Sequence, residues 1–532
     1  MSELTVREAT FALLRDFRLT TVFGNPGSTE LPMFRDFPPD FRYVLGLQES
    51  VVVAMADGFA QARRDAALVN LHSAIGVGHA LGSIFTAFRN QSPLVITAGQ
   101  QARSILPFEP FLYSEQAPQL PKPYVKWSVE PARAADVPAA IARAYYVAMQ
   151  APRGPTFVSI PVDDWDRPSE PLAARRVSSA VAGDPTLLAE AAAALSRARQ
   201  PIIVAGASVA RDGAWDEIIA LAERHQAAVW ASPMSSRNSF PEDHKLFAGF
   251  LVADRARIVQ QLAGGDLILV LGAPVFTYHV EGEGPHIPAG AQLLQLTDDP
   301  AAAARCPVGI SIVTNLKLGI AALLQQSVGA HSVKGASRAA PSIPPRATRT
   351  PGGKLTDAYL LQQIAALRPA NSIVVEEAPS SRGAMHDRLP IIDRDGFFTC
   401  ASGGLGHGLP AAVGVALASP TRKVIALIGD GSAMYAIQGL WSAARLGVAV
   451  AFIIVNNSSY RALEEFGRHF SISKLPGVQL PDLDFCALAK GHDVHSLSVD
   501  RCEDLDAALQ QVFCSQVPML LEVHVEKQGE LR

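Results

Sequence analysis

Two short motifs in the last third of the chain could together hold a divalent cation and a phosphate. Asp430 lies in a Gly-Asp-Gly-Ser sequence directly after the apolar run Val424 to Ile428, and Asn457 follows a second apolar run 27 residues later. Two buried strands joined by a helix should be parallel neighbours, so both side chains should meet at the carboxyl edge of one sheet. Carboxylate and amide oxygens suit Mg²⁺, which leaves positions for phosphate oxygens. The tight loop exposes the N–H groups of Gly431 and Ser432 at a helix start, where a phosphate is favoured.

A purely structural role is the alternative for each motif. Asp430 alone is most simply a helix N-cap, and Asn457 is most simply part of a turn. Both motifs at this spacing, with a helix and a strand between them, favour the metal site.

Three residues in the first third carry groups suited to acid–base chemistry. Ser28, Glu49 and His72 each lie just past a predicted strand (Thr20 to Phe23, Tyr43 to Leu47 and Ala67 to Leu71). In open α/β sheets, ligands bind at the carboxyl ends of the strands. Singly, these residues could be a helix N-cap, a helix-start carboxylate and a core histidine. Their shared position at one edge favours a functional site.

The composition predicts the scaffold that must position these groups. The chain has 532 residues, enough for about three domains of roughly 150 residues each. It is 48% apolar and only 18% charged, which fits an α/β protein with buried parallel strands. A net charge of −4 argues against nucleic acid or an anionic membrane as a partner.

Targeting and redox signals point to a cytoplasmic protein. No run of 18 or more apolar residues is present, and the first 17 residues fit an amphipathic helix with acidic residues rather than a signal peptide. The five cysteines show no CxxC spacing, so we expect them to be reduced and mostly buried.

We therefore predict an α/β fold with three doubly wound domains and mainly parallel sheets. The predicted domains are residues 1–170, 180–328 and 354–532, with a Ser-, Ala-, Pro- and Gly-rich linker at 329–353. The middle domain lacks a GxGxxG fingerprint, so a bound dinucleotide is not indicated and a dehydrogenase is a weak interpretation.

Several segments resemble the thiamine diphosphate (ThDP)-dependent 2-oxo acid decarboxylases. They are FGNPGS, LQE before a VVVAMADGFA helix, NLHSAIG, CASGGLGHGLP, and the GDG and NN motifs already described. The resemblance is closest to the benzoylformate decarboxylase type, since His72 is followed by Ser73 where pyruvate-type enzymes carry a second histidine.

The resemblance implies a complete cofactor site. Mg²⁺ would be held by Asp430, Asn457 and the carbonyl of Ser459, and Glu49 would hydrogen-bond N1′ of the ThDP pyrimidine. The other cofactor contacts would be Ser380, Ser381, Gly403, Leu405, Gly431, Ser432 and Tyr460.

The resemblance also implies the reaction. Glu49, Ser28, His72 and His279 would be catalytic in the non-oxidative decarboxylation of an aromatic or bulky 2-oxo acid to an aldehyde and carbon dioxide, with carboligation as a possible side activity. The substrate pocket would be formed by Ser28, Phe111, Leu112, Thr399, Leu463 and Phe466. Because one subunit would supply Glu49 and another the diphosphate site, we expect at least a homodimer, and this family is usually tetrameric.

Four residues depart from the benzoylformate type: His79, Phe111, Pro379 and Thr399 stand where we expect Asn, Leu, Thr and Phe. Thr399 in particular could open the pocket to larger or more polar substrates. The alternatives are a ThDP-dependent carboligase, a decarboxylase of a different 2-oxo acid, and a non-catalytic protein with the same fold.

Overall fold

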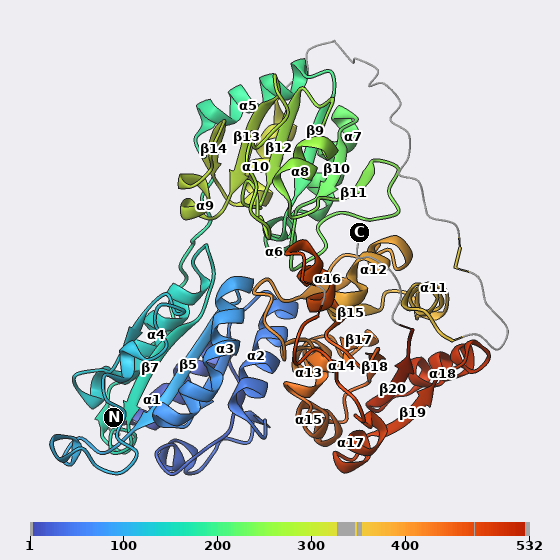
Figure 1. Ribbon diagram of the computed structural model, residues 1–532. Coiled ribbons are helices and arrows are strands. Elements are labelled where there is room, and N and C mark those ends of the chain that lie inside the picture. Colours follow the sequence, from blue (N-terminus) through green and yellow to red (C-terminus); the bar gives the residue numbers. More distant parts are fainter. Residues whose placement is uncertain (1–3, 327–345, 348–353, 473, 527–532) are drawn as a thin grey trace.

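Three six-stranded sheets form the framework of the protein (Figure 1). The computed structural model describes residues 4–326, 346–347, 354–472 and 474–526. Every strand pairing within the three sheets is parallel. This confirms the predicted α/β fold. The predicted linker at 329–353 lies outside the described residues except for 346 and 347.

The first sheet carries the predicted acid–base residues just past its strands. Its order is β3 (Arg42–Leu45), β2 (Thr21–Gly24), β4 (Ala67–Leu71), β5 (Leu94–Gln100), β7 (Thr156–Pro161) and β6 (Ser128–Val129). Its helices are α1 (Val6–Asp16), α2 (Glu49–Arg63), α3 (Ser73–Asn90) and α4 (Val137–Met149). A short antiparallel pair, β1 (Leu4–Thr5) with β8 (Pro168–Ser169), joins the ends of this unit.

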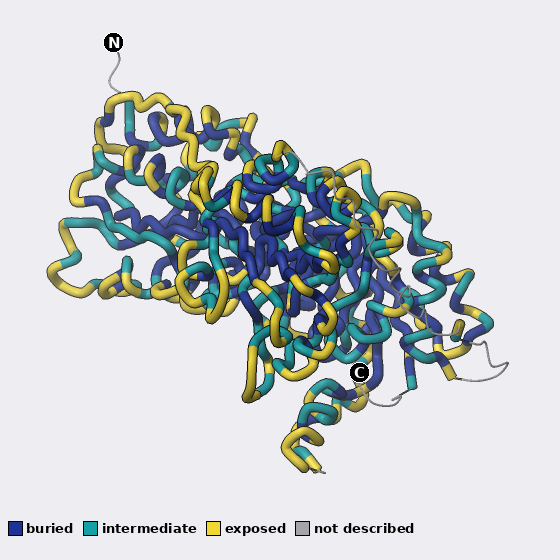
Figure 2. Tube along the Cα trace, turned by 90° about the horizontal axis from the view of Figure 1, so that it is seen from above, coloured by how far each residue is buried: buried dark blue, intermediate teal, exposed yellow. Residues whose placement is uncertain are grey.

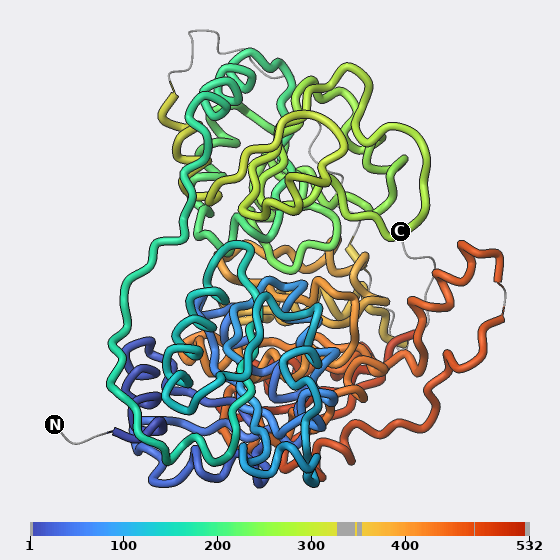
Figure 3. Tube along the Cα trace, turned by 90° about the vertical axis from the view of Figure 1, so that its left-hand side faces the viewer, coloured from blue at the N-terminus to red at the C-terminus, as the bar shows by residue number. Residues whose placement is uncertain are grey.

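The second sheet lies in a separate middle unit, which the mostly exposed, extended segment 170–184 connects to the first (Figure 3). Its order is β11 (Phe247–Phe250), β10 (Ala228–Ala231), β9 (Pro201–Ala205), β12 (Leu267–Leu271), β13 (Gln292–Thr297) and β14 (Ile310–Val313). Its helices are α5 (Pro185–Arg197), α6 (Ala207–Arg211), α7 (Trp215–His225), α8 (Arg255–Gln261), α9 (Pro300–Ala304) and α10 (Leu316–Gln325).

The third sheet contains the strand–helix–strand unit with Asp430 and Asn457. Its order is β16 (Phe397–Thr399), β15 (Ile373–Glu377), β17 (Val424–Gly429), β18 (Val450–Asn456), β20 (Met519–His524) and β19 (His495–Val499). Its helices are α11 (Asp357–Leu367), α12 (Arg382–Arg388), α13 (Gly408–Ala418), α14 (Asp430–Met434), α15 (Gly439–Leu446), α16 (Arg461–His469), α17 (Phe485–Gly491) and α18 (Cys502–Cys514). We expected the Gly-Asp-Gly-Ser sequence to be a loop, but Asp430 already begins α14.

The first and third units share one hydrophobic core, which lies deep inside the molecule (Figure 2). Helices α2 and α13 meet there with almost no space between their backbones. A Cβ on Gly414 would lie 1.9 Å from the Met55 carbonyl oxygen, and one on Gly58 would lie 2.2 Å from the Ala411 carbonyl oxygen. Glycine is therefore required at both positions for this close approach.

The cysteines only partly match the expectation. All five are free, but only Cys400 and Cys502 are buried. Among the described residues, no helix has both the length and the apolar character needed to cross a bilayer.

Candidate active site

Asp430 and Asn457 lie together at the carboxyl edge of the third sheet. Strands β17 and β18 are parallel neighbours, with Gly429 opposite Val455. Asp430 Oδ2 accepts the N–H groups of Asn457 at 3.1 Å and Ser459 at 3.3 Å, and Asn457 Oδ1 accepts the Ser459 N–H at 3.0 Å. All three residues are buried, and burial raises the pKa of Asp430. A cation beside this carboxylate would favour its charged form, so the oxygen cluster fits Mg²⁺.

The predicted phosphate contacts adjoin this cluster. Gly431 and Ser432 form the first turn of α14, directly after Asp430. The ring of Tyr460 packs against Gly431 so closely that a Cβ at position 431 would lie 2.2 Å from Tyr460 Cε1. Any larger residue at 431 would displace the tyrosine from the edge of the oxygen cluster.

Ser380 and Ser381 reach the same region from the end of β15. They lie in a single 3₁₀ turn, Pro379–Ser381. Ser380 Oγ accepts the N–H of Ala462 at 3.1 Å, and its carbonyl accepts a hydrogen bond from Arg461. These contacts fasten the turn to the start of α16, immediately after Tyr460.

The glycine-rich loop before α13 is held by a carboxylate that the sequence analysis did not single out. Glu377, at the end of β15, accepts the N–H groups of residues 406–408, those of Gly406 and His407 at 2.6 and 2.8 Å. Burial raises the pKa of Glu377, although the three N–H groups favour its charged form. The predicted cofactor contact Gly403 is exposed, with φ of 73°, and Leu405 is half-buried. Glu377 could have been found from the sequence as a carboxylate at the carboxyl end of a predicted strand.

Glu49 is the first residue of α2 and is 8% exposed. Its Oε2 lies 3.1 Å from Nδ1 of His79 on α3. Gly76, on the same helix, leaves room for the carboxylate, since a Cβ there would lie 3.3 Å from Glu49 Oε1. His79 departs from the family pattern in the sequence, but its contact with Glu49 was not predicted.

His72 is held by two residues that the sequence analysis also missed. Its Nδ1 lies 2.9 Å from Glu30 Oε2 and 3.1 Å from Thr29 Oγ1, and Glu30 is buried. A Cβ on Gly27 would lie 2.2 Å from Nδ1 of His72. Only glycine at position 27 therefore lets the turn lie this close to the imidazole. Ser28 lies exposed in the same turn. Thr29 and Glu30 could have been found from the sequence, because they follow Ser28 in a turn at the end of a strand.

The predicted pocket residues Phe111 and Leu112 lie near the start of α3. The carbonyl oxygen of Leu112 accepts a hydrogen bond from Ser73 Oγ at 3.0 Å. Phe111 is 86% exposed. The contact with Ser73 places Leu112 beside His72, and Phe111 is the residue that precedes it.

His279, from the middle unit, lies against α16 of the last unit. Its ring centroid is 4.7 Å from that of Phe466, with 16° between the planes, and its N–H donates to the Ala253 carbonyl at 2.8 Å. Leu463, three residues before Phe466, is 54% exposed. These three predicted residues form an aromatic and aliphatic surface next to Tyr460.

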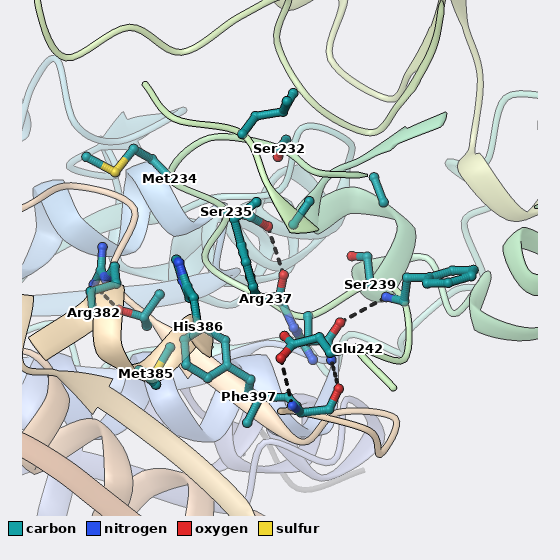
Figure 4. Close-up of a pocket in the computed structure, with 18 of the residues that line it drawn as sticks. Ser232, Met234, Ser235, Arg237, Ser239, Glu242, Arg382, Met385, His386 and Phe397 are labelled. Atoms are coloured by element: carbon teal, nitrogen blue, oxygen red, sulfur yellow. Dashed lines mark hydrogen bonds between the residues drawn. The ribbon is translucent and has the colours of Figure 1, made fainter. Parts of the chain in front are cut away.

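Thr399 lies apart from this surface. It is buried, its Oγ1 donates to the Glu376 carbonyl at 2.8 Å, and it accepts a hydrogen bond from Arg382 at 3.1 Å. Thr399 and Arg382 line a cavity of about 120 Å³ between the middle and last units (Figure 4). His386, also in the wall, stacks on Phe250 with 3.6 Å between ring centroids, and burial lowers its pKa to about 3.

The predicted residues thus form two groups that lie apart within one chain. The first group lies in the first unit and includes Ser28, Glu49 and His72. The second group lies in the last unit and includes the glycine-rich loop, Asp430 and Asn457. Glu49 contacts α3 at Gly76 and His79, near the start of the helix. The glycine-rich loop contacts its last two turns, where Ser402 Oγ lies 2.9 Å from Thr86 Oγ1 and the Ala401 N–H donates to Asn90 Oδ1 at 2.8 Å. Thr86, the nearer of the two contacts, lies 10 residues after Gly76, which corresponds to about 15 Å of helix.

The second group fits the diphosphate and metal end of ThDP. Its candidate ligands for a cation are all oxygens, so Asp430, Asn457 and Ser459 would hold Mg²⁺, and its predicted phosphate contacts are N–H and hydroxyl groups. The first group supplies an acid, a hydroxyl and an imidazole, which suit the pyrimidine ring and the substrate.

Comparisons with known proteins agree with this chemistry. The chain matches three sequence profiles of thiamine pyrophosphate enzymes: the N-terminal TPP binding domain at residues 4–119, the central domain at 188–323 and the C-terminal TPP binding domain at 382–523. It is 47% identical to the benzoylformate decarboxylase of Pseudomonas aeruginosa over 525 residues, 98% of each chain.

Two solved structures are also similar over 99% of this chain and 100% of theirs. The benzoylformate decarboxylase of Polynucleobacter necessarius superimposes with a TM-score of 0.94 at 40% identity. The thiamine diphosphate-dependent 4-hydroxybenzoylformate decarboxylase of Rhodococcus jostii RHA1 superimposes with a TM-score of 0.93 at 42% identity.

Proposed function

The chain belongs to the thiamine pyrophosphate enzyme family, and from that premise we propose that it decarboxylates an aromatic 2-oxo acid of the benzoylformate type. The observation that carries the proposal is the buried oxygen cluster of Asp430 and Asn457 next to the glycine-rich loop, in a chain that also keeps Glu49. The products are an aldehyde and carbon dioxide.

Each polar residue has one task in this reaction. Bound ThDP would supply the sink for the electron pair that remains on the substrate when carbon dioxide leaves. Glu49 would hold a proton at N1′ of the cofactor pyrimidine. His72 and His279 carry protons to and from the reacting oxygen and carbon atoms, and Ser28 binds the carboxylate of the substrate.

The acyl group of the substrate packs against apolar side chains. Phe466, Leu463 and the face of His279 supply one wall, and Phe111 and Leu112 supply the other from a second chain. These flat and branched side chains favour an aromatic acyl group over a short aliphatic one. Thr399 lies apart from these walls, in the cavity that it lines with Arg382.

The cofactor site requires two copies of the chain. Glu49 must reach N1′ of the same pyrimidine ring whose amino group the loop at Gly403 binds, so the two residues must lie within one ring's width. The separation of about 15 Å along α3 prevents this within one chain. We therefore infer that Glu49 of one chain completes the site of another in a homodimer, and that two dimers form a tetramer.

Mixing two inactive variants tests the shared site. Glu49→Gln and Asp430→Ala homodimers should both be inactive, but a mixed dimer contains one site with neither change. After unfolding and refolding together at equal amounts, about one quarter of the wild-type activity should return. A mixture that stays inactive while each variant remains dimeric would show that each site is built by a single chain.

A panel of 2-oxo acids separates the remaining alternatives. With ThDP and Mg²⁺ present, benzoylformate and 4-hydroxybenzoylformate should release carbon dioxide faster than pyruvate or a branched aliphatic acid. Faster turnover of an aliphatic acid would identify a different decarboxylase, and aldehyde coupling without decarboxylation would identify a carboligase.

A further inference from the structure

His79 contacts Glu49 but is not one of the predicted catalytic residues. Nδ1 of His79 lies 3.1 Å from Glu49 Oε2, a hydrogen-bonding distance. The Glu49 side chain is 11% exposed, whereas that of His79 is 57% exposed. Among the described residues, His79 is the one side chain that hydrogen-bonds to this carboxylate.

The local backbone is shaped for this pair. His79 lies three residues after Gly76, so both face α2 from neighbouring turns of α3. A side chain at 76 would press on the carboxylate, because a Cβ there would lie 3.3 Å from Oε1 and 3.4 Å from Cγ of Glu49. Glycine at 76 leaves space for one oxygen of the carboxylate, and His79 lies at hydrogen-bonding distance from the other.

The other ionisable groups near this end of the helices have their own partners or face solvent. His72 is paired with Glu30. The loop that contacts Ser73 through Leu112 carries Glu109 and Glu115, both exposed. His79 is thus the group that bears on Glu49 directly.

We propose that His79 is a positioning residue for Glu49: it fixes Oε2 through Nδ1–H and so presents Oε1 to the cofactor pyrimidine. This inference rests on the proposed function and deepens it. A hydrogen bond to one oxygen restricts the rotamer of the carboxylate. The other oxygen is then already oriented towards N1′ when the cofactor binds. Misplacement of a reacting group by about 1 Å can cost roughly 100-fold in rate.

A first experiment examines the pair without turnover. In the protein free of cofactor, the ¹⁵N shifts of the histidine rings report which nitrogen carries the proton. The His79 signals, assigned by their loss in His79→Asn, should show Nδ1 protonated. Glu49→Leu removes the acceptor and should shift His79 towards the Nε2–H tautomer. Unchanged His79 signals in Glu49→Leu would overturn the inference.

A second experiment uses matched substitutions. The amide nitrogen of Asn takes roughly the place of imidazole Nδ1, so His79→Asn should keep turnover within about threefold of wild type, whereas His79→Leu should lower kcat about 10- to 100-fold with little change in KM. His495→Asn, at an exposed position of strand β19 in the last unit, is the control and should match wild type.

Cofactor binding keeps the second experiment interpretable. His79→Leu should still bind ThDP and Mg²⁺, measured by calorimetry, but its near-ultraviolet circular dichroism should lose the signal of the imino tautomer of the pyrimidine. Equal losses of kcat in His79→Asn and His79→Leu, or a wild-type kcat and dichroism spectrum in His79→Leu, would refute the positioning role. If no 2-oxo acid is turned over by the wild type, the proposed function fails, and the ring shifts and dichroism still decide this inference.

Discussion

Asp57 and His407 form a buried ion pair that fastens the glycine-rich loop to the first unit. Asp57 Oδ2 lies 2.9 Å from His407 Nε2 and accepts from Asn90 Nδ2 at 2.8 Å. Asp57 Oδ1 accepts from Gln61 Nε2 at 2.9 Å and from the Ser92 hydroxyl. Asp57 is fully buried and His407 is 2% exposed. Replacing Asp57 with Asn keeps the shape but removes the charge that these donors surround.

The burial of the pair determines how far Asp57→Asn lowers the free energy of unfolding. Removing one partner of a buried pair typically costs about 3–5 kcal/mol in the free energy of unfolding. The substituted asparagine would retain one acceptor oxygen, but its NH₂ group would face the donors of His407 and Asn90. We therefore expect Asp57→Asn to lie towards the upper end of that range. In contrast, Asp493→Asn, which breaks the exposed pair with Arg445, should cost less than about 1 kcal/mol.

The loss should depend on pH. Burial opposes the charge on His407, but Asp57 outweighs it and raises the pKa of His407; burial also opposes the charge on Asp57, but His407 and the other donors lower its pKa. The contribution of His407 to the free energy of unfolding is full below about pH 6.5 and is lost as the pH rises through its raised pKa. The contribution of Asp57 is full above about pH 3.9 and is lost as the pH falls through its lowered pKa. The pair therefore contributes most between these two limits.

Urea unfolding of the cofactor-free protein, followed by tryptophan fluorescence, measures the difference. Relative to wild type, Asp57→Asn should shift the midpoint down strongly at about pH 5.5 and less at about pH 9. A shift no larger than that of Asp493→Asn, or a larger shift at the higher pH than at the lower, would refute the reasoning.

Three further predictions follow from the fold and the site. Gly414→Ala should cost at least about 2 kcal/mol of stability, seen as a lower melting temperature, because its methyl group would collide with the Met55 carbonyl; an unchanged melting temperature would contradict the backbone contact. Asp430→Asn should weaken Mg²⁺-dependent ThDP binding roughly 100-fold by calorimetry, the equivalent of one charged contact, and equal affinity would place the metal elsewhere. Thr399→Val should lower stability by about 1–3 kcal/mol because it removes the hydroxyl bonded to Glu376, with less effect on KM; a KM effect without a stability effect would put Thr399 in the substrate pocket.

The sequence predicts those features of the protein that depend on neighbouring residues. Buried parallel strands appear as short apolar runs, and the residue after each run lies at the carboxyl edge of a sheet. This reasoning places Asp430 and Asn457 just past two adjacent strands, and Ser28, Glu49 and His72 past the strands of the first sheet. It works because strand position and sheet edge are both local properties.

The parts that sequence reasoning missed are contacts between distant residues. The Asp57–His407 pair joins residues 350 positions apart. Asp57 lies in the VVVAMADGFA segment and His407 in CASGGLGHGLP, but neither segment indicates that the two side chains meet. The hydrogen bond of Thr399 to Glu376 depends on how two neighbouring strands place their ends. The contact of His79 with Glu49 depends on the packing of two helices, which no spacing within one segment reveals.

The hydrophobic core shared by the first and last units has a consequence for how the chain melts. That core draws apolar side chains from both ends of the sequence, whereas the apolar clusters of the middle unit are made only of its own residues. The two terminal units should therefore unfold as one cooperative block, with the middle unit as a second. A calorimetric scan should therefore show two heat absorption peaks rather than one for each of the three sheets.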